Sequence, residues 1–184
     1  MMQLQTGGKK ILRQFVLRLC SCKQSIALAI LALAWMPIPA QQKQERTVLT
    51  ISWADSHATP IKFSLVALEK LEHKKLVMEL PPNFGLSGKH EWSGVPLRSV
   101  LAAAKATHFS TLRVVALDGY QVSIPAEDLV RYDPLLAYQR DGQYIAIRDR
   151  GPLFLVYPFD QYPELQKVLF MNRTIWQAST IILQ

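Results

Sequence analysis

The sequence has no cysteine after residue 22. Its two cysteines, Cys20 and Cys22, both fall within the first 40 of the 184 residues. Residues 41–184 by themselves can therefore form no disulfide and no zinc-thiolate site, and they offer no thiol nucleophile. Chemistry that depends on a thiol is excluded for that part of the chain.

Acidic side chains are missing from the first 40 residues, which hold five of the 21 lysines and arginines. The other 144 residues carry 16 basic and 14 acidic side chains, so their net charge is only +2. A protein that binds nucleic acid needs clustered lysine and arginine on one face. The near balance of charge argues against a nucleic-acid partner, while 49% apolar residues are enough for a hydrophobic core.

The sequence also lacks the short motifs of several enzyme classes. Its eight glycines form neither G-x-G-x-x-G nor G-x-x-x-x-G-K-[ST], so no loop for nucleotide phosphates is indicated. The four histidines lie far apart and form no H-x-H or H-E-x-x-H pair. Any metal site would have to be assembled by the fold, and four separate histidines with no shared role remain the simpler interpretation.

The first 40 residues have the layout of a secretory signal peptide. A cationic stretch precedes an uncharged apolar centre at 25–35, and Pro37, Pro39 and Ala40 follow it. The apolar stretch is shorter than the roughly 20 residues that a transmembrane helix needs. We expect cleavage after Ala40 and a periplasmic protein, with 41–47 as a flexible leader and 48–184 as one domain. Because Ile38 is bulky for a cleavage site, an uncleaved anchor that attaches the protein to the membrane remains an alternative.

The first half of the domain shows strand and helix patterns in turn. Alternating apolar residues predict a strand at 48–53, and Ser64 can cap a helix over 65–72. A second strand is expected at 76–80, followed by a loop over 83–94. Pro96 then begins the clearest helix, in which Leu97, Val100 and Leu101 share one face.

The pattern of the second half predicts strands joined by two tight turns. Asp118-Gly119 lies between apolar runs at 112–117 and 120–124, and Asp141-Gly142 lies between runs at 135–139 and 144–147. Asp-Gly in this setting is typical of a type I′ hairpin, which needs positive φ at both residues. Helical turns are expected at 125–130 and 163–169, and strands at 153–157 and 175–183. The sum predicts a single α+β domain with a mixed β-sheet and short helices.

Charged and aromatic residues gather in the same half. Arg140, Arg148 and Arg150 flank the second hairpin, where they could bind an anionic ligand or form weak surface ion pairs with their neighbours. Seven aromatic residues lie between 144 and 176, and they belong to the core, to the wall of a pocket or to both.

Several segments together resemble a known family. They are HEWSGVPLRSVL at 90–101, LDGY at 117–120, IPAEDL at 124–129, RDG at 140–142, RDRGPL at 148–153, VYP at 156–158 and RTIWQ at 173–177. In this order they are similar to small exported bacterial proteins of the oxidoreductase molybdopterin-binding domain family, which share the sulfite oxidase fold. The resemblance extends over 49–183 and implies that fold for this chain.

The resemblance also implies what a catalytic member would contain. In catalytic members a cysteine thiolate binds molybdenum, and it precedes the segment that resembles 92–97, which places it within 80–89 of this chain. That stretch here begins Leu80-Pro81-Pro82-Asn83-Phe84 and holds no cysteine. A thiolate is a soft, charged ligand that the side chains present there replace poorly.

Three functional hypotheses follow. The leading one is an exported, non-catalytic domain that needs no cofactor and binds a small anionic ligand or a protein partner. The second is a periplasmic oxidoreductase or electron-transfer component that holds molybdopterin without a cysteine ligand, its arginines binding the pterin phosphate. The third is an accessory subunit that docks to a membrane or periplasmic protein. The candidate ligand-binding residues are His90, Trp92, Tyr120, Arg140, Arg148, Arg150 and Arg173, and we predict no catalytic residue and no metal ligand.

Overall fold

The computed structural model describes residues 45–55 and 58–184. The predicted signal peptide, both cysteines and most of the predicted leader lie outside these residues. No helix in the described part of the chain has the length and apolar character that crossing a membrane requires.

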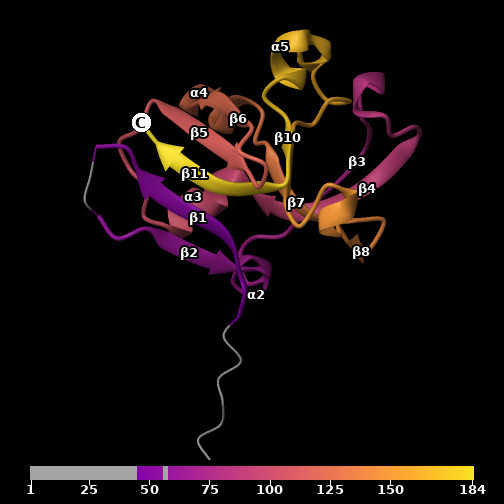
Figure 1. The fold of residues 1–184 in the computed structure, drawn as a ribbon. Helices are drawn as coiled ribbons and strands as arrows, with labels where there is room; N and C mark the ends of the chain where they lie inside the picture. Colours follow the sequence, from indigo (N-terminus) through magenta and orange to yellow (C-terminus); the bar gives the residue numbers. More distant parts are fainter. Residues whose placement is uncertain (1–44, 56–57) are drawn as a thin grey trace, which may run out of the picture. The chain divides into compact units, whose positions relative to one another are not determined.

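The first of two sheets, sheet A, contains five strands in the order β2-β1-β11-β5-β6 (Figure 1). Its central pair, β1 (Thr47–Trp53) and β11 (Ala178–Leu183), is parallel, and its other neighbouring strands are antiparallel. The remaining strands are β2 (Ile61–Ser64), β5 (Thr111–Ala116) and β6 (Gln121–Pro125). This is the mixed sheet that the sequence predicted, although β2 was not expected.

Sheet B has the strand order β10-β9-β7-β4-β3, with β8 paired to β7, and all its pairs are antiparallel. Its strands are β3 (Lys74–Glu79), β4 (Lys89–Pro96), β7 (Leu135–Arg140), β8 (Gln143–Tyr144), β9 (Phe154–Val156) and β10 (Ile175–Trp176). Sheet B is an addition to the single sheet that the sequence indicated, and the α+β class holds.

Short helices connect the strands. They are α2 (Leu65–Glu69), α3 (Leu97–Ala103), α4 (Ala126–Arg131), α5 (Val168–Met171) and the 3-10 helices η1 (Pro82–Phe84), η2 (Ile147–Asp149) and η3 (Pro163–Gln166). The Ser64 hydroxyl caps α2 by accepting a hydrogen bond of 3.1 Å from the Ala67 N–H, as predicted.

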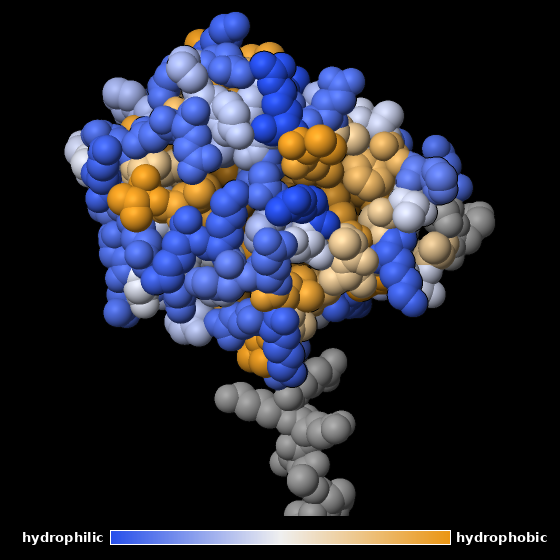
Figure 2. All heavy atoms as spheres, turned by 180° about the vertical axis from the view of Figure 1, so that it is seen from behind, coloured by the Kyte–Doolittle hydropathy of each residue, from blue (hydrophilic) through white to orange (hydrophobic). Residues whose placement is uncertain are grey.

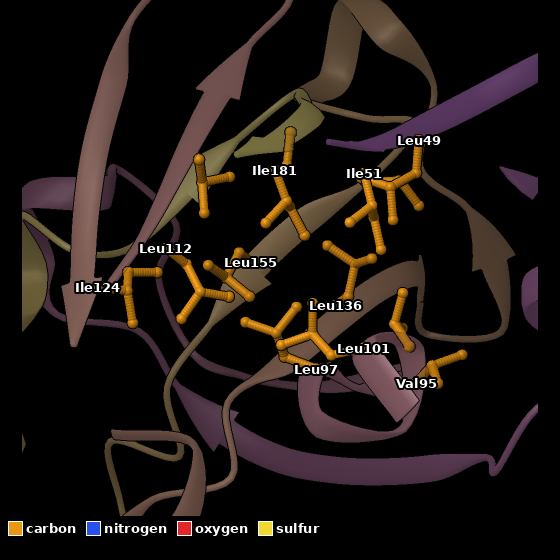
Figure 3. Packing of buried hydrophobic residues seen from close by; sticks show 14 of the residues in the cluster. Leu49, Ile51, Val95, Leu97, Leu101, Leu112, Ile124, Leu136, Leu155 and Ile181 are labelled. Carbon is orange, nitrogen blue, oxygen red and sulfur yellow. The ribbon is translucent and has the colours of Figure 1, made fainter. Parts of the chain in front are cut away.

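Two hydrophobic clusters form the core. One is mainly aliphatic and joins sheet A to α3, and Figure 3 shows Leu155 of sheet B lying in it with Ile181 of sheet A. The other lies against sheet B and is rich in aromatic rings. Strand β9 contributes to both, because Leu155 belongs to the first cluster and its neighbours Phe154 and Val156 belong to the second.

The two predicted hairpins differ in their turns. Asp141 and Gly142 have φ of 52° and 74°, so the second hairpin has the predicted type I′ geometry. In the first hairpin Gly119 has positive φ but Asp118 does not, and the type I′ prediction is wrong there. Strand β8 is also shorter than the predicted strand at 144–147, because Ile147 already begins η2.

The expected loop at 83–94 is wrong over its second half, where residues from 89 onward form β4. Ser93 and Gly94 suggested a loop, yet both are buried in the middle of sheet B. A side chain at Gly94 would place its Cβ 2.2 Å from the Leu136 carbonyl oxygen, so this strand requires glycine there. The final predicted strand is divided, because Gln177, with φ of 54°, passes the chain from sheet B to sheet A.

Candidate functional site

A cavity of about 300 Å³ opens where three separate segments meet. One segment is η1, the second is the turn between β5 and β6, and the third runs from the end of α5 into β10. The residues that line the cavity are Asn83, Phe84, Asp118, Tyr120, Met171, Asn172, Thr174, Ile175 and Trp176. This volume is at the lower end of what small-molecule sites usually provide.

Aromatic rings form one wall of the cavity and continue into the core. Phe84 is buried, and its ring centroid lies 6.4 Å from that of Trp176 in an edge-to-face arrangement. Toward the core, the Phe84 ring also packs on Phe154, with 6.3 Å between the ring centroids. Phe154 in turn packs on Trp92, with 5.3 Å between the centroids. Such edge contacts hold each ring in place, so the wall at Trp176 is supported by the sheet B core.

Arg150 lies beside this wall. Its Nη1 donates a hydrogen bond to the Phe84 carbonyl oxygen, and its guanidinium carbon lies 4.8 Å from the centre of the Trp176 ring. A guanidinium stacked on an indole ring is preorganised. Within the part of the chain that the structure describes, its other N–H groups make no hydrogen bond and could donate to a ligand. Arg150 is thus the one predicted arginine that contacts two residues of the cavity wall.

The segment that carries Arg150 is fixed on both sides. A Cβ at Gly151 would lie 1.8 Å from the Ile145 carbonyl oxygen, so no larger residue fits there. The Gln177 side chain donates to the Ile147 carbonyl oxygen at 2.8 Å, and the Gln177 N–H donates to that of Arg150 at 3.0 Å. The close approach of Ile145 explains the glycine at 151, and the Gln177 contacts hold the backbone on either side of η2.

Asp118 is the single charged residue in the lining of the cavity, and its Oδ1 accepts a hydrogen bond of 3.0 Å from the Tyr120 N–H. The other polar groups in the lining are the Asn83 and Asn172 amides and the Thr174 and Tyr120 hydroxyls. The lining contains no thiol and no histidine. Among the described residues no three His, Cys, Asp or Glu side chains gather as a metal site would require.

Three other predicted residues come together on sheet B. His90 Nδ1 donates to Asp141 Oδ2 at 2.7 Å, and this bond holds the pKa of the Asp141 carboxyl below its usual range. The centroid of the His90 ring lies 6.3 Å from that of the buried Trp92 ring. The Arg140 guanidinium carbon lies over the same Trp92 ring, 6.0 Å from its centre. Arg140 and Asp149 also line a smaller cavity of about 120 Å³.

Arg173 forms an ion pair with the buried carboxylate of Asp128. Its Nη1 lies 2.8 Å from Asp128 Oδ2, to which the Tyr157 hydroxyl also donates at 2.7 Å. Burial, reinforced by the hydrogen bond to Asp128, raises the pKa of Tyr157. The Arg173 side chain therefore joins the segment between α5 and β10 to α4 in a structural ion pair.

Arg148 is almost fully exposed and makes only a loose ion pair of 3.5 Å with Asp149. The structure therefore distributes the seven predicted residues over several places. Tyr120 and Arg150 belong to the cavity or its wall, His90, Trp92 and Arg140 form a second group, and Arg148 and Arg173 stand apart. Phe84 and Trp176 were not among the predicted site residues, although both the 80–89 segment and the late aromatics had been singled out.

Part of the chain matches a known protein family. Residues 36–162 match the family described as "Oxidoreductase molybdopterin binding domain". A comparison with curated proteins gives no match.

A solved structure is similar in fold. It is the sulfane dehydrogenase SoxCD from Paracoccus pantotrophus, to which this chain is 19% identical with a TM-score of 0.52. The likeness covers 73% of this chain and 37% of that chain, so this protein spans little more than a third of its length. At this identity the likeness concerns the fold alone.

Proposed function

The chain belongs to the oxidoreductase molybdopterin-binding domain family, and from this membership and the cavity at Trp176 we propose that it is a non-catalytic, exported ligand-binding domain. The fold is the one that the sequence resemblance implied. Within it, the cavity would hold a small ligand with an apolar ring against Phe84 and Trp176. An anionic group on the ligand would reach the free N–H donors of Arg150.

The donor set of the cavity is the observation that carries this proposal. Family membership suggests molybdopterin as a possible cofactor, and its binding would require a ligand for the metal and cations for the phosphate. The lining offers no thiol, and its single charged side chain is Asp118. Arg173, which could have bound the phosphate, is paired with Asp128. Of the predicted arginines, Arg150 alone contacts the cavity wall, and it could hold one anionic group. The lining has no thiol to bind the metal, so these residues do not fit molybdopterin held by a cysteine ligand.

Family membership favours a second candidate, a periplasmic molybdopterin protein without a cysteine ligand. It is tested by measuring molybdenum by elemental mass spectrometry, and pterin by fluorescence after oxidation, on protein purified from the periplasm of cells grown with molybdate. We expect neither. Molybdenum and pterin in near-equal amount to the protein would overturn the leading proposal and establish the second candidate.

Ligand binding is tested with 8-anilinonaphthalene-1-sulfonate, a fluorescent probe that combines an apolar ring system with a sulfonate. We expect Arg150→Ala to weaken its binding about 10-fold or more, because a hydrogen bond to a charged group is lost. Arg148→Ala is the matched control. It removes the same charge, but at an exposed position two residues earlier in the chain. If both variants bind the probe as tightly as the unmodified protein does, the assignment of the site is wrong.

Export to the periplasm rests on the layout of residues 1–40. We expect the protein isolated from the periplasm to begin at Gln41, which N-terminal sequencing would reveal. A protein that still carries residues 1–40 and sediments with the membrane fraction would establish the uncleaved anchor instead.

A protein partner at the same place would make the domain an accessory subunit. Near the cavity, Leu117, Tyr120 and Leu169 expose large apolar side chains, and aromatic residues of this kind are common at interfaces. Seen from the side opposite to that of Figure 1, the surface is largely hydrophilic and also shows hydrophobic patches (Figure 2). Weaker binding of the dye in the presence of a candidate partner would assign that partner to the cavity.

A further inference from the structure

Strand β3 is an outer strand of sheet B, and its edge is open. The Glu91 N–H donates to Asp141, and the Glu91 carbonyl oxygen accepts from the Asp141 N–H, so the backbone groups of Glu91 face away from β3. Glu91 is the register partner of Val77. In an antiparallel ladder this makes Val77 a residue of a non-hydrogen-bonded pair, and its own N–H and carbonyl point to the open edge.

The Glu79 N–H independently indicates which backbone groups of β3 point to the open edge. It lies 3.5 Å from an Asp160 carboxylate oxygen instead of bonding to β4. Backbone groups alternate in direction along a strand, so Lys75, Val77 and Glu79 all present theirs at the edge. Within the described residues, no backbone hydrogen bond uses those of Lys75 and Val77.

The side chains on this edge are complementary in charge to those of a second copy. Within the chain Lys75 Nζ donates to Glu91 Oε1 at 2.7 Å and Glu79 Oε1 accepts from the Gly88 N–H at 3.0 Å, so contacts with a second copy would be shared with these partners. Val77 is 64% exposed, with Lys75 two residues before it and Glu79 two residues after it on the same face. If two β3 strands pair antiparallel about a two-fold axis at Val77, each Val77 meets the other, and each Lys75 lies opposite Glu79 of the second copy. The outward backbone groups then also coincide. The two Val77 residues exchange two hydrogen bonds, and each Lys75 N–H donates to the Glu79 carbonyl oxygen of the second copy, while the Glu79 N–H keeps its contact with Asp160.

The other outer strands do not offer this match. Strand β6 ends in Pro125, which has no N–H to donate. Strand β2 has four residues, and β10 and β8 have two each. An open strand is a ready template for another chain, and the register of β3 selects one that is identical to itself.

We propose that two copies of this protein associate through β3, in an antiparallel two-fold pairing centred on Val77 that joins their B sheets into one. The contact is isologous, as in most homodimers. Because a single strand pair buries little surface, the dimer is weak and its population depends strongly on concentration. The cavity at Trp176 is not part of this contact.

Sedimentation equilibrium tests the proposal on protein purified from the periplasm of cells that express the full chain, at about 1 μM to about 1 mM. We expect a monomer–dimer equilibrium. Val77→Pro removes the central N–H, and because that group points outward the substitution leaves the pairing with β4 in place. We expect this variant to remain folded by circular dichroism and to be monomeric throughout.

Charge variants keep the test decisive if the proline variant does not fold. Glu79→Lys places two lysines opposite each other in both halves of the contact, so we expect the dissociation constant to rise about 10-fold. The exchange Lys75→Glu with Glu79→Lys restores opposite charges and should restore the dimer. Glu127→Lys, at an exposed position of α4, is the control and should leave the dissociation constant unchanged.

A protein that is monomeric at every concentration would overturn the proposal. So would a dimer that Val77→Pro, once shown to be folded, and Glu79→Lys both leave intact. A folded double exchange that stays monomeric would contradict the register centred on Val77. None of these results depends on whether the cavity binds a ligand, so this inference stands or falls separately from the proposed function.

Discussion

The two hydrophobic clusters of this domain are built from different side chains. Among the buried members of the sheet A cluster, Phe63 and Tyr138 are aromatic and the others are aliphatic. The sheet B cluster contains Phe84, Trp92, Tyr132, Phe154, Tyr157, Phe159 and Phe170. Branched aliphatic side chains pack interchangeably, whereas aromatic rings interact in set geometries and carry polar ends.

The cavity and most of the predicted ligand-binding residues lie on the aromatic side. Trp92 and Phe84 are themselves members of the sheet B cluster, and Arg140 and Arg150 stack on aromatic rings at its margins. Of the residues that line the cavity, Ile175 belongs to the aliphatic cluster and Phe84 to the aromatic one. The comparison indicates that the aliphatic half supplies stability, and that the aromatic half supplies both stability and the shape of the site.

Two neighbouring residues of β9 test this comparison most directly. Phe154→Ala should lower the free energy of unfolding by about 3–5 kcal/mol, and Leu155→Ala by about 2–5 kcal/mol, because each leaves a cavity in a buried cluster. Urea unfolding measures both losses. Only Phe154→Ala should also weaken binding of the fluorescent dye, since Phe154 supports Phe84. Equal effects of the two variants on dye binding would remove the distinction between the clusters.

The buried ion pair on the aromatic side gives the next effect. Asp128→Ala leaves Arg173 without its partner and the Tyr157 hydroxyl without an acceptor. We expect a loss of about 3 kcal/mol in the free energy of unfolding, measured by urea titration. Asp149→Ala breaks the exposed pair with Arg148 and serves as the control, with an expected change below about 1 kcal/mol. Similar losses for both would contradict a structural role for Arg173.

A smaller effect is expected on the aliphatic side, at the start of α2. Ser64→Ala removes the hydroxyl that caps this helix and should cost about 1 kcal/mol. Ser64→Asn restores an acceptor for the Ala67 N–H and keeps a donor for the Glu45 carboxylate, so it should recover most of the loss. Thermal unfolding of the three proteins measures the difference, and dye binding should be the same in all of them.

The smallest effect concerns pH and the tip of the second hairpin. The lowered pKa of Asp141 means that its ionised form is favoured in the folded protein, mainly by the hydrogen bond from His90. The stabilising contribution is therefore present above the usual carboxyl pKa of about 4 and is lost as the pH falls through the lowered value. Asp141→Asn should be slightly less stable than the unmodified protein at pH 6, and the difference should shrink toward pH 3. A difference that grows on acidification would contradict this sign.

Local patterns in the sequence anticipated most elements of the fold. The capped helix after Ser64, the helix after Pro96 and the turn at Asp141-Gly142 each depend on a few adjacent residues. The positions that prediction missed depend on distant contacts. Gly94 is in a strand because the Leu136 backbone approaches it, and the last strand is divided at Gln177, a residue whose positive φ no local signal announces.

The candidate site was predictable only in part for the same reason. Arg150 stood out by its charge, and Tyr120 by its position after the Asp118-Gly119 turn. The structure places Tyr120 in the lining of the cavity and Arg150 beside its wall. Arg173 looked equally promising until Asp128, 45 positions earlier in the chain, was found to neutralise it. Phe84 lies in the segment that the family resemblance singled out, yet no spacing rule connects it to Trp176, 92 positions later.

The crossing at Gln177 also sets an order of events during synthesis. It delivers β11 to the middle of sheet A, between β1, made early, and β5, made halfway along. Until residues 178–183 have been synthesised, β1–β2 and β5–β6 are two separate hairpins with no strand to join them. Sheet A can therefore close only after its central strand β11, the last strand of the chain's described part, has been made.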